Sequence, residues 1–99
     1  MINNQLLNRT WNELKNDQSL PVETKINDLC KLFSDFAGVG KPDAHCQEIK
    51  DGFKKLQLEL NTTNKRSLRK ALQKPNPLFD PETKLILKEI ANWVKTLHK

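Results

Sequence analysis

Apolar residues recur every three or four positions along most of this 99-residue chain, in runs separated by proline, glycine and asparagine. This period matches the 3.6 residues of an α-helical turn and places the apolar side chains of each run on one face. The chain has only three glycines, and its β-branched residues do not alternate with polar ones as they do in strands. The pattern predicts an all-α fold, a compact bundle of four to five short helices.

The breaks in the pattern divide the chain into five helical segments. They span about 4–17, 19–38, 41–60, 64–74 and 80–97. Asp80 suits the cap of the last segment and Pro81 its first turn. Gly38 and Gly40 suit the end of the second segment. We interpret residues 61–64, which are rich in capping side chains, as the turn before the fourth segment.

The apolar face of each segment predicts the core. The residues of these faces are Leu7, Thr10, Trp11, Leu14, Val22, Ile26, Leu29, Cys30, Phe33, Phe36, Cys46, Ile49, Phe53, Leu56, Leu60, Leu68, Ala71, Leu72, Ile86, Leu87, Ile90, Trp93, Val94 and Leu97. The sequence leaves open whether Trp11 or Trp93 is instead a partly exposed anchor for a partner. Gly52 costs roughly 1 kcal/mol inside a helix. We interpret it as the close approach of a neighbouring helix, with room for a bound partner as the alternative.

Residues 1–99 are long enough for a single domain, and the net charge of +5 is unevenly spread along it. Residues 1–40 carry four basic and five acidic side chains, and residues 41–60 carry four of each. Residues 61–99 carry nine basic and three acidic side chains, so the whole excess lies there. Such asymmetry favours an anionic partner for the C-terminal part.

The N-terminal residues do not combine a basic start with an apolar run, so we expect no signal peptide. No stretch approaches the roughly 18 apolar residues that span a bilayer. We expect a cytoplasmic protein in which Cys30 and Cys46, both on apolar faces, are free thiols of the core.

No motif indicates a catalytic or metal centre. Gly38-Val39-Gly40-Lys41 is similar to the end of a phosphate-binding loop, but Pro42 stands where that loop needs Ser or Thr. The soft metal ligands of the chain are Cys30, His45, Cys46 and His98. The spacing of the two cysteines is not that of a zinc knuckle. We expect no enzyme, no metal and no cofactor.

The fourth segment, residues 64–74 with the sequence NKRSLRKALQK, holds five basic residues and no acidic one. The basic residues are Lys65, Arg66, Arg69, Lys70 and Lys74. They occupy one half of a helix, and the three apolar residues occupy the other half. Like charges four residues apart repel by a few tenths of a kcal/mol, which an anionic partner would remove. A merely solvated surface is the alternative interpretation.

Residues 63–72, TNKRSLRKAL, resemble the second helix of a helix-turn-helix, with Asn64 as the capping residue and Leu68, Ala71 and Leu72 as the packing residues. The helix and the later Asn76-Pro77-Leu78-Phe79 are similar to addiction-module antidotes (antitoxins) and phage-type regulators. The resemblance covers about 58–90. The motif's usual turn glycine is replaced by Thr62 in this chain.

The resemblance implies a DNA-binding regulator. The residues that would face the major groove or its phosphates are Asn64, Lys65, Arg66, Ser67, Arg69 and Lys70. Backbone contacts would come from Lys54, Lys55 and Lys74. We therefore expect a non-enzymatic protein that binds DNA through a basic helix. The alternative is a helical module that binds a protein with an acidic surface, such as an immunity protein, an inhibitor or a death-fold-like adaptor; a homodimer also stays open.

Overall fold

The computed structural model describes residues 4–38 and 44–97, which form five α-helices and, within these ranges, no strand. The helices are α1 (Asn4–Asn16), α2 (Val22–Gly38), α3 (Ala44–Leu58), α4 (Thr62–Leu72) and α5 (Pro81–Lys95). The predicted all-α fold of short helices is confirmed. Gly40 and the predicted start of the third segment at 41–43 lie outside the described residues.

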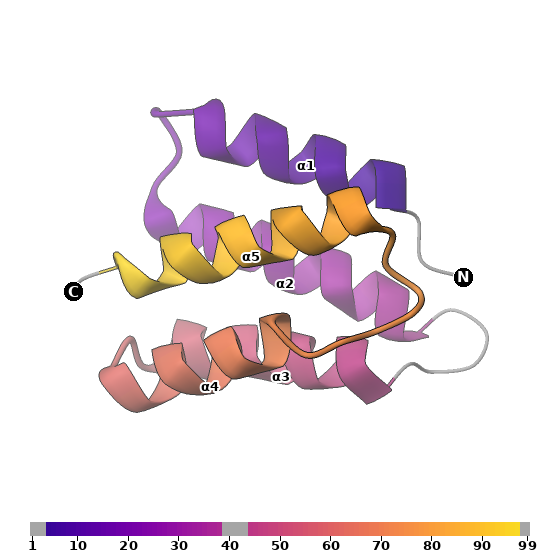
Figure 1. The fold of residues 1–99 in the computed structure, drawn as a ribbon. Coiled ribbons are helices and arrows are strands. Elements are labelled where there is room, and N and C mark those ends of the chain that lie inside the picture. Colours follow the sequence, from indigo (N-terminus) through magenta and orange to yellow (C-terminus); the bar gives the residue numbers. More distant parts are fainter. Residues whose placement is uncertain (1–3, 39–43, 98–99) are drawn as a thin grey trace.

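The helix contacts close into a ring. Each helix packs against the next one along the chain, and α5 also packs against α1. In Figure 1, α5 crosses the middle of the molecule between α1 above it and α4 below it. A three-residue turn, 59–61, joins α3 to α4, and the two helices run in opposite directions. This order places one flank of α4 beside α3 and the other beside α5.

A single hydrophobic core receives side chains from all five helices. Phe33 of α2 and Phe53 of α3 are fully buried, and their rings stack with centroids 5.8 Å apart. Trp11 is buried against the half-buried Trp93 in an edge-to-face contact at 5.6 Å, which joins α1 to α5.

The predicted core is confirmed at nearly every described position. Val22 is the exception, because it lies in the first turn of α2 and is 38% exposed. Leu60 and Trp93 are half-buried and pack against the edge of the core, and Thr10 is also half-buried. The side chain of Phe36 lies outside the described part of the structure.

Gly52 lies where α3 meets α4. A Cβ atom at this position would stand 3.0 Å from Cδ1 and 3.4 Å from Cα of the fully buried Leu68. The interpretation of Gly52 as the close approach of a neighbouring helix is therefore confirmed.

The predicted turn over residues 61–64 is wrong, because α4 already begins at Thr62. Asn61 is the cap, and its side chain accepts a hydrogen bond from the Asn64 backbone N–H at 2.7 Å. The Asn64 side-chain amide donates to the carbonyl oxygens of Lys55 at 3.2 Å and Glu59 at 2.8 Å. The Lys55 carbonyl also accepts from the Glu59 backbone N–H at 2.9 Å, so Asn64 adds a second hydrogen bond there and ties the start of α4 to the end of α3. Asn61 therefore takes the capping role that the resemblance implied for Asn64.

Asp80 caps α5 as predicted, and its Oδ1 accepts from the Thr83 N–H at 2.7 Å. The hydrogen bonds from the Thr83 backbone and then its side chain favour the carboxylate, so they hold the pKa of Asp80 below its ordinary value of 3.8. Stability from an ionised Asp80 is present above the unfolded pKa and is lost as the pH falls through the folded one.

We expect wild-type protein to lose stability relative to the Asp80→Asn variant as the pH falls below about 4, because asparagine keeps the cap but does not titrate. Urea unfolding of both proteins across the acid range measures this difference. The pKa of Asp17 is also lowered, mainly by the Ser19 side chain. Both proteins contain Asp17, so its contribution to the pH dependence of stability drops out of the difference between them. A difference that stays constant with pH would contradict the prediction.

Candidate functional site

α4 carries most of the predicted site, and its packing decides where the charges lie. Its buried residues are Leu68, Ala71 and Leu72. They turn the opposite half of the helix outward, so Arg66 and Lys70 are exposed, while Lys65 and Arg69 are half-buried. One flank of the helix borders α3 and the other borders α5. The basic residues are therefore divided between two different surroundings.

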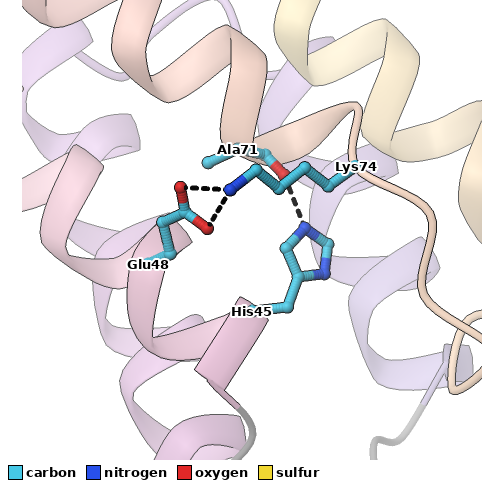
Figure 2. A network of polar contacts seen from close by, with 4 residues as sticks. All are labelled: His45, Glu48, Ala71 and Lys74. Atoms are coloured by element: carbon cyan, nitrogen blue, oxygen red, sulfur yellow. Dashed lines mark hydrogen bonds and ion pairs between the residues drawn. The ribbon is translucent and has the colours of Figure 1, made fainter.

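On the side of α4 that faces α3, the carboxylate of Glu48 offsets one of the positive charges, that of Lys74. The Nζ atom of Lys74 lies 2.8 Å from both carboxylate oxygens of Glu48 (Figure 2). The two side chains are about half exposed, so the pair adds little stability, but it gives Lys74 a partner. Lys55 and Ser67 line a hollow here together with Glu48 and Asp51. Segment 64–74 itself holds no acidic residue, and the carboxylate that pairs with Lys74 comes from α3.

His45 lies next to this ion pair and joins the start of α3 to the end of α4 (Figure 2). Its Nε2 bonds to the Ala71 carbonyl, and its Nδ1 lies 3.0 Å from Nδ2 of Asn76. The amide Nδ2 can only donate, so Nδ1 accepts and Nε2 carries the proton given to Ala71. His45 thus ties the start of α3 to the end of α4 and to Asn76. Within the described residues no three His, Cys, Asp or Glu side chains are grouped to hold a metal, and His98 lies outside them.

Three of the predicted site residues lie away from a shared surface or serve the fold. Asn64 closes the α3–α4 turn. Lys65 donates from Nζ to the Leu97 carbonyl at 2.9 Å, at the C-terminal end of α5, where a positive charge is favourable. Lys54 lies on the α2 side of α3, where its ammonium partly opposes the burial that raises the pKa of the Cys30 thiol.

Between α4 and α5 lie two hollows, and no described residue that lines them is acidic. The first, of about 150 Å³, is lined by Thr62, Lys65, Arg66, Arg69 and Lys95. The second, of about 330 Å³, is lined by Leu72, Gln73, Lys74, Pro75, Lys84, Leu87 and Lys88. We call the cations of both hollows the α4–α5 basic face, which consists of Lys65, Arg66, Arg69, Lys74, Lys84, Lys88 and Lys95.

α5 separates its own charges onto opposite flanks. Its three lysines in the α4–α5 basic face follow one another at intervals of four and seven residues, which places them on one side of the helix. On the other side, Glu89 pairs with Lys15 of α1 at 3.0 Å. Glu82 lines a polar surface with residues of α1. The fold thus turns the carboxylates of α5 toward α1 and away from the cations.

Sequence reasoning missed the contribution of α5 to this surface. The missed residues are Lys84, Lys88 and Lys95. Their spacing was a visible signal, but it does not say which neighbour their side of the helix meets. Lys70, by contrast, is exposed on α4 and lines neither hollow.

No protein-family model, curated protein or solved structure matches this chain. A separate finding is that no helix within residues 4–38 and 44–97 has the length and apolarity to cross a membrane.

Proposed function

We propose that this protein is a non-enzymatic helical binding protein whose α4–α5 basic face binds the phosphate backbone of duplex DNA. One observation carries the proposal. Seven cations, six from α4 and α5 and Lys74 from the turn after α4, line the two hollows between these helices, and the described lining residues include no carboxylate. Such a surface attracts a polyanion independently of its sequence.

The dimensions of the face suit a duplex. From Lys84 to Lys95 the axis of α5 advances about 17 Å, at about 1.5 Å per residue. A duplex carries about ten phosphates over that length. Several of these phosphates can therefore lie opposite the cations of the face that have no partner in the protein.

Some of the residues expected to contact DNA already make hydrogen bonds within the protein, which reduces the set that can read bases. Arg66, Ser67 and Lys70 are exposed and are the α4 residues free to reach base edges if this helix enters the major groove. Asn64 and Lys65 are held by carbonyl groups of the protein. The α4–α5 basic face, to which Arg66 belongs, sets affinity and register, and Ser67 and Lys70 would add sequence preference.

A salt titration of DNA binding tests the proposal. If five cations of the face contact phosphates, the logarithm of the affinity should fall against the logarithm of salt concentration with a slope of about −4.5. Fluorescence anisotropy of a labelled mixed-sequence duplex measures this slope. Absence of binding at low salt by a folded protein would overturn the proposal.

A protein partner is the second candidate, favoured by one observation on another face. Leu58 is 88% exposed and borders a hollow of about 520 Å³ whose apolar lining includes Val22 and Leu60. A large apolar side chain at the mouth of an apolar hollow is typical of contacts between proteins. Failure of the duplex titration would favour this candidate.

A further inference from the structure

The smaller hollow of the α4–α5 basic face has the size of a site for one small anion. Its volume of about 150 Å³ equals that of about five waters at about 30 Å³ each. A tetrahedral oxyanion fits this space. Four of its five lining residues are cations, three from α4 and one from α5.

The charges of this hollow are not neutralised by the described residues around it. Lys65 and Arg69 are four residues apart on α4, and Arg66 and Arg69 are three apart, so both pairs repel. No described carboxylate lies within ion-pair distance of Arg66, Arg69 or Lys95. The ammonium of Lys65 is held at 2.9 Å by the Leu97 carbonyl, which leaves the two arginines and Lys95 to meet a ligand.

Arg69 gives a second and independent indication. Its Nε atom is shielded from solvent and donates to no protein atom. A buried donor without an acceptor is rare and destabilising, more so when the group is charged. A guanidinium, of which Arg69 contributes one to the lining of the hollow, matches a phosphate with two parallel hydrogen bonds.

The N-terminus of α4 adds to the attraction. Thr62 is the first residue of this eleven-residue helix and lines the hollow. The positive end of the helix dipole favours an anion there, and the threonine hydroxyl can donate to an oxygen.

We propose that this hollow, formed by Thr62, Arg66, Arg69 and Lys95, is a socket for a single phosphate group. The identity of its natural ligand, a phosphate of a nucleic-acid strand, rests on the proposed function. Two sources share this chemistry, the internal phosphodiester and the terminal phosphate monoester.

Titration of the ¹⁵N-labelled full chain with inorganic phosphate tests the socket directly. The Arg69 Nε–H signal and the Thr62 amide signal should shift and saturate, and sodium chloride at equal ionic strength should not reproduce the change. Arg69→Gln and Lys95→Gln should each weaken phosphate binding about tenfold or more, since each removes a charge-assisted contact. Lys31→Gln, an equal charge loss on the exposed surface of α2, is the matched control and should leave it within about twofold.

Two results would overturn the socket. One is a shift that chloride reproduces, and the other is an equal loss of phosphate binding in the Lys31→Gln control. Lys95 is exposed, so its substitution keeps the test valid if Arg69→Gln disturbs the fold.

Measurements of duplex binding then test the socket and the DNA proposal separately. They also distinguish an internal phosphodiester from a terminal phosphate monoester as the ligand. Weaker binding after removal of a 5′-terminal phosphate assigns the monoester, and unchanged binding assigns the diester. Saturable phosphate binding without duplex binding supports the socket and defeats the DNA proposal. Duplex binding with no saturable binding of inorganic phosphate defeats the socket and leaves the DNA proposal standing.

Discussion

The Phe53→Ala variant should lose about 3–5 kcal/mol of unfolding free energy, the largest stability effect that we expect from a single substitution in this chain. Phe53 is fully buried at the centre of α3, and its ring stacks on Phe33 of α2 at 5.8 Å. Truncation removes this contact and leaves a cavity that the surrounding helices fill only in part. A domain of this size is stable by only about 5–15 kcal/mol, so the variant should be close to unfolding at physiological temperature.

Leu58→Ala is the matched control, because it truncates a large apolar side chain on the same helix. Leu58 is 88% exposed, so its loss should change stability by no more than about 0.5 kcal/mol. Urea unfolding followed by circular dichroism measures both variants. Equal destabilisation of the two proteins would show that the contact of α2 with α3 is not where this fold derives its stability.

A triple variant of the α4–α5 basic face, Arg66→Gln with Lys84→Gln and Lys88→Gln, should bind duplex DNA about 100-fold more weakly at physiological salt. Each lost phosphate contact should reduce the magnitude of the salt slope by about 0.9, and three by about 2.7. All three side chains are exposed, so the helices should fold as in the wild-type protein. Anisotropy titrations at several salt concentrations measure both quantities.

The control removes three positive charges that line neither hollow, with Lys25→Gln, Lys31→Gln and Lys50→Gln on α2 and α3. It changes the net charge equally and therefore weakens long-range attraction to the same extent. Its salt slope should match that of the wild-type protein, because it removes no phosphate contact. If the two triple variants behaved alike, DNA binding would depend on net charge and not on the α4–α5 basic face.

Local signals in the sequence were sufficient for the helices and most of their buried faces. Leu68, Ala71 and Leu72 were assigned to the core from their spacing alone, and all three are buried. Asp80 and Pro81 marked the start of α5 correctly. These signals work because helix period and capping depend on residues within one or two turns of each other.

The start of α4 shows where local signals become ambiguous. Asn61 and Asn64 are both good caps by type. The choice between them depends on the carbonyl oxygens of Lys55 and Glu59, which the end of α3 presents to the Asn64 amide. Only the packed turn between the two helices decides which asparagine caps.

By itself, the sequence determined that this chain is an all-α protein with a strongly basic helix after residue 60. Only the tertiary structure decided the electrostatic partners of that helix. It brought Glu48, 26 residues away, onto Lys74, and it placed Lys95 beside Arg66 and Arg69. The physical reason is that helix formation depends on separation along the chain, whereas charges interact according to their distance in space. The candidate site therefore emerged from the contact between α4 and α5.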